Sequence, residues 1–388
     1  MRTAKTKGAS PAGRFRSGWQ RLLIMFLGAL LLLSAGCAGK EKPSGAAAVP
    51  LEYATGFRIE QLEGGSYLVT DGEGRRLLLL PRGRQAPAQY AGLTRVETPV
   101  RRVVVNSTHE AALLRALGEL GSIVGVTEKE ERWHIAEIKE GMKQGRIRLV
   151  GSGMAPLDYE AVMALKPDLV FTYTGFPDTV QVVRKLEELN LPVAVENSHL
   201  ETDPLGQLEW LKFMAVFYGK LDAADRYFRE AVKQAQDVKA TVERAGSRPR
   251  VLWGIIFEGK CYIPAGESYA ANMISLAGGE YLFRDVKGTG TTTVSLEEFY
   301  ARGRQADVFV LSSLPEGRVS IAGLVKQEPR LADLPAVREG RVWCFQPWYY
   351  QSFDRIVEII TDLAVMFHPE LFPGAEPRHY LRLPAGDR

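Results

Sequence analysis

The stretch from residue 221 to residue 246 reads LDAADRYFREAVKQAQDVKATVERAG and decides how the rest of the chain is organised. Residues with a high helix propensity make up most of it, and no Pro or Gly interrupts it before its last position, so it predicts one long helix. Asp222 or Asp225 is expected to cap its start, and Gly246 followed by Pro249 to end it. At about 1.5 Å per residue this helix would be a strut of about 36 Å. Its apolar positions recur every three or four residues and form one narrow stripe, which consists of Tyr227, Ala231, Ala235, Val238 and Val242.

A similar short pattern stands on each side of this helix. Residues 157–171 read LDYEAVMALKPDLVF, and residues 295–310 read SLEEFYARGRQADVFV. Each begins with leucine and acidic residues, continues as a short helix, and ends in an acidic residue followed by an apolar strand. Helix followed by buried strand is the unit of a parallel α/β sheet. The sequence therefore predicts two related α/β lobes with parallel sheets, joined by the long rigid helix.

The remaining sequence extends this plan in both directions. Residues 102–105 and 250–256 are apolar strands that open the two lobes, and residues 203–219 predict a further helix before the strut. Gly64-Gly65 and Asp71-Gly72 are hairpin signals, which predict a small antiparallel extension of two or three strands. The predicted segments are a signal peptide over 1–36, a tether over 37–50, the β-hairpin extension over 51–98, the first lobe over 99–199, the helical connector with the strut over 200–246, and the second lobe over 247–388.

The amino terminus carries most of the positive charge. The whole chain has a formal net charge of +3. Residues 1–36 contain six basic residues and no acid, so their removal leaves 3 − 6 = −3. A mildly acidic mature protein argues against nucleic acid as a partner.

The first 36 residues have the layout of a targeting signal. The apolar run LLIMFLGALLLL, residues 22–33, follows the basic stretch and is short for a transmembrane helix. Ser34, Ala35 and Gly36 then precede Cys37. This arrangement resembles a bacterial lipoprotein signal, in which Cys37 would be the lipidated first residue, and a plain secretory signal is the alternative. Attached acyl chains would anchor an exported protein to the membrane.

Two cysteines remain after Cys37. Cys261 and Cys344 both lie in apolar, strand-like runs of the second lobe. In an exported protein they could form a disulfide or stay as buried free thiols, and the sequence leaves both alternatives open. Two cysteines alone do not make a zinc site.

Four segments together resemble one known family. They are LDYEAVMALKPDLVF, PAGESYAANMISLAGGEYLF, VSLEEFYARGRQADVFVL and LPAVREGRVWCF. Over residues 100–369 the chain resembles the periplasmic binding proteins that capture iron complexes and cobalamin for ABC importers. The resemblance implies two α/β lobes joined by one long helix, with a ferric siderophore, haem or cobalamin bound between them. It also implies a monomer that delivers this small-molecule metal complex to an ABC permease dimer and its ATPase, with no intrinsic cofactor and no enzymatic activity.

The resemblance assigns a role to one acid in each short pattern. Glu160 and Glu297 stand at matching places, and in the family acids there sit on the tips of the lobes and meet permease arginines. The alternative is that each stabilises the first turn of a helix. Asp158 and Glu298 are neighbouring acids that could share or replace the docking role.

Aromatic residues near predicted strand ends are the candidates for the ligand cleft, because α/β proteins place their binding loops there. Each would bury a large surface against a partly planar ligand, and ordinary core packing is the alternative for each. The run of three consecutive aromatics after the last strand is the strongest signal, since its members cannot all face one core. The candidates are Trp133, Tyr173, Phe176, Trp253, Tyr262, Trp348, Tyr349 and Tyr350.

Other residue types separate the possible ligands. Anionic siderophores call for cleft cations such as Lys260, Arg284, Lys287 or Arg355, although solvated surface is the commoner state for each. Cobalamin calls for aromatic and polar walls, and haem for a Tyr or His axial ligand, for which His134, His199 and many tyrosines are available.

Two other kinds of site fit the sequence less well. A bare metal ion would need dispersed ligands such as His109, His199 and Glu201, since no HxH or HxxxH pair exists. An exported enzyme is the weakest alternative, because the glycine-rich stretch at residues 151–153 lacks the third glycine of a dinucleotide loop.

Overall fold

The computed structural model describes residues 46–151, 157–175, 177–314 and 320–386. The predicted signal peptide and Cys37 lie outside these residues. The end of the predicted tether forms the first strand, β1 (Ala47–Ala48). Within the described ranges, no helix is both long enough and apolar enough to cross a membrane.

The N-terminal extension is larger than predicted. It is a five-stranded sheet in the order β1-β2-β3-β4-β5, in which β1 to β4 are antiparallel and β5 runs parallel to β4. The predicted turns at Gly64-Gly65 and Asp71-Gly72 fall between strands. The additional strand β5 alternates exposed and buried residues around a single valine, which is too weak a pattern to predict a strand. The strands are β2 (Arg58–Gln61), β3 (Tyr67–Thr70), β4 (Arg76–Pro81) and β5 (Thr94–Thr98).

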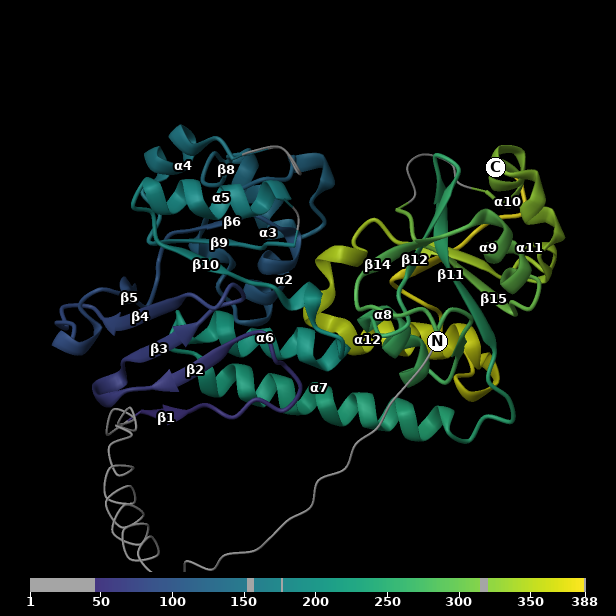
Figure 1. The fold of residues 1–388 in the computed structure, drawn as a ribbon, viewed down its shortest axis with the longest axis horizontal. Helices are drawn as coiled ribbons and strands as arrows, with labels where there is room; N and C mark the ends of the chain where they lie inside the picture. Colours follow the sequence, from purple (N-terminus) through teal and green to yellow (C-terminus); the bar gives the residue numbers. More distant parts are fainter. Residues whose placement is uncertain (1–45, 152–156, 176, 315–319, 387–388) are drawn as a thin grey trace, which may run out of the picture. The chain divides into compact units, whose positions relative to one another are not determined.

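The first lobe is a parallel five-stranded sheet with helices around it, as predicted (Figure 1). The strand order is β10-β9-β6-β7-β8, with β6 (Val103–Val105), β7 (Ile123–Val126), β8 (Arg148–Leu149), β9 (Leu169–Thr172) and β10 (Val193–Val195). The helices are α2 (Thr108–Ala116), α3 (Ala136–Lys143), α4 (Tyr159–Leu165) and α5 (Pro177–Glu188). Helix α2 starts where its sequence dictates, because Ser107 and Glu110 form a capping box.

The second lobe has a mixed sheet. Its centre, β11-β15-β16, is parallel, and antiparallel strands β12, β14 and β17 complete the order β14-β12-β11-β15-β16-β17. The strands are β11 (Arg250–Phe257), β12 (Lys260–Pro264), β13 (Glu280–Tyr281, beside β11), β14 (Thr291–Val294), β15 (Val308–Leu311), β16 (Val342–Phe345) and β17 (Tyr380–Arg382). The helices are α8 (Tyr269–Leu276), α9 (Leu296–Gly303), α10 (Ile321–Gln327), α11 (Pro335–Arg338) and α12 (Ile356–Phe367).

Short 3-10 helices connect many of these elements. They are η1 (Glu63–Gly65), η2 (Ala88–Tyr90), η3 (Leu120–Ser122), η4 (Glu130–Arg132), η5 (Ser198–Leu200), η6 (Pro329–Asp333), η7 (Tyr349–Gln351), η8 (Phe353–Arg355) and η9 (Pro369–Leu371).

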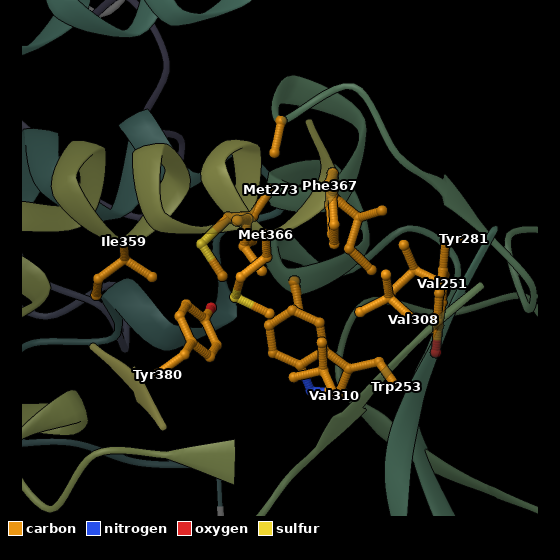
Figure 2. Close-up of a cluster of buried hydrophobic side chains, with 14 of the residues drawn as sticks. Val251, Trp253, Met273, Tyr281, Val308, Val310, Ile359, Met366, Phe367 and Tyr380 are labelled. Atoms are coloured by element: carbon orange, nitrogen blue, oxygen red, sulfur yellow. The ribbon is translucent and has the colours of Figure 1, made fainter. Parts of the chain in front are cut away.

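The core of the second lobe combines buried residues of its sheet with residues of α8, α9, α11 and α12. Figure 2 shows Val251 and Trp253 of β11 with Val308 and Val310 of β15, and side chains of α8 and α12 meet them. All of these side chains are buried. The continuous apolar runs of β11 and β15 are thus explained by burial on both faces of the sheet.

The strut is α7 (Leu221–Val242), and it packs on α6 (Pro204–Val216) and on α12. Ala224 belongs to the first lobe's core, whereas the buried residues from Phe228 to Val242 belong to the core of the second. The predicted aspartate cap is wrong: Lys220 occupies the cap position and makes no capping hydrogen bond with its side chain, and Asp225 pairs with Lys212 and Arg229. The strut is therefore a packed part of both cores.

The two cysteines of the second lobe, whose pairing the sequence leaves open, are free thiols, and both are buried. Cys261 lies on β12 and Cys344 on β16. Burial raises the pKa of each thiol to about 11. Both side chains therefore serve as core packing.

Candidate ligand-binding cavity between the lobes

A cavity of 560 Å³ lies between residues of the two lobes. Its volume falls within the usual range for small-molecule sites. From the first lobe it is lined by Gly175, His199 and Leu200, and from the second by Trp253, Ile255, Tyr262, Ile263, Pro264, Ser268, Tyr269, Ala270, Thr289, Gly290, Thr291, Ser312, Phe345 and Tyr350. A second cavity of 700 Å³ in the second lobe shares Ile255, Ser312 and Tyr350 with it.

The carboxyl ends of parallel strands in both sheets supply five residues of this lining. Gly175 follows β9, and His199 and Leu200 lie in η5, which follows β10. In the second lobe, Ser312 comes directly after β15, and Phe345 is the last residue of β16. The carboxyl ends of parallel strands are where α/β proteins bind ligands, so the cavity lies where the fold predicts it.

Three of the predicted aromatic residues line the cavity. They are Trp253, Tyr262 and Tyr350. Tyr173 is absent from the described lining but contacts one of its members, with its ring centroid 5.8 Å from that of His199. Phe176 lies outside the described residues.

Three other predicted aromatics do not line it. Trp133 is 1% exposed and donates a hydrogen bond to the carbonyl of Glu128 at 3.0 Å, so it belongs to the core of the first lobe. Tyr349 is also 1% exposed and stacks on Phe345 with ring centroids 4.0 Å apart. Trp348 is 36% exposed and packs beside His134, 5.8 Å away, in a separate groove.

The turn at η7 explains this division of the aromatic run. A 3-10 turn directs successive side chains about 120° apart, so one member of the run enters the core while its neighbours leave it. Tyr349 is the buried member, and Tyr350, 44% exposed, reaches the cavity.

The imidazole of His199 is half-buried in the first-lobe wall. Burial lowers its pKa, and a hydrogen bond to the backbone of Thr174 opposes this shift. The other ring nitrogen, Nε2, is buried without a partner. A Cβ atom at Gly175 would lie 2.9 Å from Nε2, so Gly175 covers this nitrogen closely. The phenols of Tyr262, Tyr269 and Tyr350 lie in the same cavity wall.

The described wall of the cavity carries no Asp, Glu, Lys or Arg side chain. Of the four cations considered for the cleft, Lys260, Arg284 and Lys287 are exposed and do not line the cavity, and Arg355 lines the separate groove beside Trp348. The wall combines aromatic rings with hydroxyl and backbone groups. Such a surface suits a ligand with a large apolar face and little charge at the point of contact.

Comparison with known proteins agrees with this geometry. The sequence profile of the periplasmic binding protein family matches residues 103–347. The chain belongs to the periplasmic binding protein family. It is 31% identical over 296 residues to an uncharacterized lipoprotein of Methanocaldococcus jannaschii, covering 74% of this chain and 70% of that one. It is 23% identical over 283 residues to the vitamin B12-binding protein of Vibrio parahaemolyticus, covering 72% and 94% of the two chains.

A solved structure shares the fold. A periplasmic heme-binding protein from Pseudomonas aeruginosa superimposes with a TM-score of 0.58 at 22% identity, over 74% of this chain and 98% of that one. Periplasmic binding proteins are exported solute-binding components of ABC transporters and work with permease components. They are not enzymes, so this chain binds a solute and does not transform it.

The bare-metal alternative finds no support in the geometry of this periplasmic binding protein. Among the described residues, no group of three or more His, Cys, Asp or Glu side chains could hold a metal ion. The carboxylate of Glu201 accepts hydrogen bonds from the backbone of Thr55 and Gly56 and from Trp210 instead. His109 contacts the hydroxyl of Ser198 at 2.8 Å.

The two predicted docking acids occupy equivalent positions in this periplasmic binding protein. Glu160 is the second residue of α4 and Glu297 the second residue of α9, and both are exposed. Neither carboxylate bonds to another residue in the described part of the chain. Their neighbours are engaged, because Asp158 caps α4 and Glu298 pairs with Arg302 at 2.7 Å.

Sequence reasoning missed several lining residues. Tyr269, the first residue of α8, reaches the cavity because Ser268 caps the helix directly at its edge. The cap serine followed by an aromatic residue was a usable signal. Phe345 and Leu200 gave none, since one ends an ordinary apolar strand and the other stands in a polar loop.

Proposed function

We propose that this periplasmic binding protein captures a cobalamin-like corrinoid between its two lobes and delivers it to an ABC permease. The observation that carries the proposal is the uncharged, aromatic wall of the interlobe cavity. Trp253, Tyr262, Tyr269 and Tyr350 supply flat apolar surfaces, and hydroxyl groups such as Ser312 supply hydrogen bonds. Corrinoid side chains are mostly neutral amides, which such a wall binds without charged partners.

The similarity to the vitamin B12-binding protein of Vibrio parahaemolyticus supports the same ligand class. An anionic ferric siderophore is disfavoured, because binding it would need cleft cations, and the described wall supplies none.

Haem is the second candidate, and the tyrosines favour it. Tyr262, Tyr269 and Tyr350 place phenol groups in the cavity wall, and a Tyr oxygen is one of the axial ligands that haem iron accepts. The Pseudomonas aeruginosa neighbour binds heme. His199 is a weaker axial candidate, because Gly175 covers its unpartnered Nε2.

Delivery would use the exposed acids on the two lobes. Glu160 and Glu297 are free to meet cations of the two permease subunits, and exposed ion pairs of about 0.2–1 kcal/mol each would let the protein detach after transfer. Cys37 would carry a lipid anchor that holds the protein at the outer side of the cell membrane. Acyl labelling of the full chain that disappears in Cys37→Ser would support the anchor, and labelling that persists would contradict it.

The test of ligand class is a calorimetric titration of residues 38–388 with cyanocobalamin, haemin and ferric enterobactin. We expect cyanocobalamin to bind, and Tyr269→Ala to weaken that binding at least tenfold. Trp348→Ala is the matched control, because it removes a partly exposed aromatic outside the cavity and should leave affinity unchanged. Binding of haemin alone would favour the second candidate. Binding of none of the three would overturn the proposal.

A further inference from the structure

The N-terminal sheet precedes the part of the chain that the family profile matches, which begins at residue 103. Residues 71–75, the 71–75 turn, connect its strands β3 and β4. Although these residues are far in sequence from the first lobe, they make several hydrogen bonds with the end of β10 and with the loop after β9. The 71–75 turn is therefore joined to the elements that form the first-lobe wall of the cavity.

The first set of bonds joins the turn to the end of β10. The carboxylate of Asp71, 1% exposed, accepts a hydrogen bond from the backbone N–H of Val195 at 3.1 Å. The N–H of Gly72 donates to the carbonyl of Val195 at 3.0 Å. Arg75 donates to the carbonyl of Val193 at 3.0 Å and pairs with Asp71. The turn thus fixes the strand end from which His199 and Leu200 follow.

The second set of hydrogen bonds joins the turn to Asn197 and Thr174, which stand next to the residues that line the cavity. Asn197 donates to the carbonyl of Gly72 at 3.3 Å and to the hydroxyl of Thr174 at 2.7 Å. Its side-chain oxygen accepts from the N–H of Thr174 at 2.8 Å. The hydroxyl of Thr174 in turn donates to the carboxylate of Glu73. Asn197 and Thr174 are both buried, so these bonds form in a place where an unpaired polar group would be costly.

These bonded residues stand directly beside the cavity wall. Thr174 precedes Gly175, and its backbone holds one ring nitrogen of His199. Asn197 stands two residues before His199. Gly175, His199 and Leu200 are the described residues that the first lobe contributes to the cavity. The position of this wall is therefore fixed by Thr174 and Asn197, which the 71–75 turn holds.

The packing at Gly72 leaves no room for a side chain. A Cβ atom at this position would lie 2.8 Å from Cβ of Asn197, closer than atoms of real side chains approach. An alanine there must displace Asn197 or the turn. Gly92 offers a matched comparison in the same sheet region, because a Cβ atom there would meet nothing within 4 Å.

We propose that the 71–75 turn is a built-in part of the ligand site, in which Gly72 and Glu73 position the first-lobe wall and so set affinity and ligand preference. The N-terminal sheet then has a role in ligand selection beyond that of a spacer. The inference rests on the proposed function only in taking this wall to contact the ligand.

The test compares two matched pairs in the protein from residue 38 to 388. Gly72→Ala is compared with Gly92→Ala, and Glu73→Ala with Glu73→Gln, which keeps an acceptor for the hydroxyl of Thr174. Calorimetry with cyanocobalamin and haemin gives the dissociation constant and the stoichiometry separately. Hydrogen exchange reports the amide of Thr174, which Asn197 protects.

We expect Gly72→Ala and Glu73→Ala to raise the dissociation constant at least fivefold, to change the ratio of the two ligands' affinities, and to speed exchange at Thr174. The two control variants, Gly92→Ala and Glu73→Gln, should bind both ligands and exchange at Thr174 as the wild type does. A variant that is merely less stable would lower the stoichiometry and leave the dissociation constant of the folded fraction unchanged.

Unchanged dissociation constants in Gly72→Ala and Glu73→Ala would overturn the inference, as would an equal loss in Gly92→Ala. If the wild type binds neither ligand, the proposed function fails, and hydrogen exchange at the amide of Thr174 alone tests whether the turn positions the first-lobe wall. Faster exchange at Thr174 in Gly72→Ala but not in Gly92→Ala would then support the inference, and equal exchange would overturn it.

Discussion

The guanidinium of Arg115 in the first lobe donates two hydrogen bonds to the carboxylate of Asp354 in the second, at 2.6 and 3.0 Å. Arg115 also donates to the carbonyl of Gln351 at 2.8 Å. The side chain of Gln351 bonds back to the backbone of Arg132 and His134. These contacts form an interlobe clamp that adds to the strut, so the two lobes are held together at two places.

Loss of the clamp should weaken the whole protein. Asp354 is 2% exposed, so Arg115→Ala leaves a buried carboxylate without its partner and should lower the free energy of unfolding by about 3–5 kcal/mol. Urea denaturation measures this. Arg229→Ala is the control, because that arginine pairs with Asp225 at a side-chain exposure of 71% and should cost less than about 1 kcal/mol. Equal losses in the two variants would contradict the clamp.

Removing both docking acids should separate binding from transport. Glu160→Ala with Glu297→Ala should leave ligand affinity unchanged, because neither residue lines the cavity. Two exposed ion pairs of about 0.2–1 kcal/mol each correspond to a roughly 2- to 30-fold loss of docking affinity, so uptake into permease-containing vesicles should fall at low protein concentration.

The control for docking removes two other exposed glutamates, Glu63 on the N-terminal sheet and Glu243 after the strut. Uptake by that double variant should equal that of the wild type. Weakened ligand binding in the Glu160–Glu297 variant, or normal uptake, would remove the docking assignment.

The free thiols should not react with alkylating reagents until the protein unfolds. Cys261 and Cys344 are buried, and burial raises the pKa of each to about 11, so the reactive thiolate is scarce at neutral pH. We expect residues 38–388 to react with iodoacetamide at both cysteines only in denaturant, and the melting temperature to be the same with and without dithiothreitol. A lower melting temperature under reduction would indicate a disulfide instead.

Stability should depend on pH through Glu196, which is buried beside His109, Glu110 and Glu201. Burial raises the pKa of Glu196 from its ordinary 4.5 to about 7. Between these values the unfolded carboxyl has lost its proton while the folded one keeps it, so this group makes the protein less stable as pH rises from 4.5 to 7. His109 acts in the opposite sense, because burial lowers its pKa to about 3 and only the unfolded imidazole gains a proton as pH falls.

Glu196→Gln isolates the contribution of that carboxyl. The unfolding free energy of the variant, relative to the wild type, should increase by about 3 kcal/mol between pH 4 and pH 8. Chemical denaturation at several pH values measures the difference, with exposed Glu63→Gln as the control. A difference that is independent of pH would show that Glu196 ionises normally in the folded protein.

The sequence predicted the plan of the fold because the plan follows local rules. The apolar runs that became β6, β9, β11 and β15 are buried on both faces of their sheets, and the stripe on α7 meets both cores. The acidic cap expected for α7 was wrong because the helix begins at Leu221, with Lys220 at the cap position, which leaves both aspartates inside the helix. Asp225 pairs with Lys212 of α6, a residue that lies beside α7 only in the folded chain.

The candidate site was only partly predictable. Residue type indicated all three lining aromatics, Trp253 and Tyr262 by their place around the first strand of the second lobe and Tyr350 by its place after the late strand. Whether a given aromatic residue in a turn faces the cavity or the core depends on how the turn packs, which is why Tyr349 was placed wrongly. The bonds of Asp71 and Glu73 to the first-lobe loops join residues about a hundred positions apart, and no local pattern encodes such pairs.

The most direct test of the interlobe site is a tryptophan-fluorescence titration of residues 38–388 with cyanocobalamin, in the wild type and in Trp253→Phe. Trp253 is the tryptophan in the described lining of the cavity. We predict saturable quenching in the wild type and a clearly smaller amplitude in the variant. No saturable quenching by cyanocobalamin, haemin or ferric enterobactin, or an amplitude that Trp253→Phe leaves unchanged, would contradict a metal-complex site between the lobes.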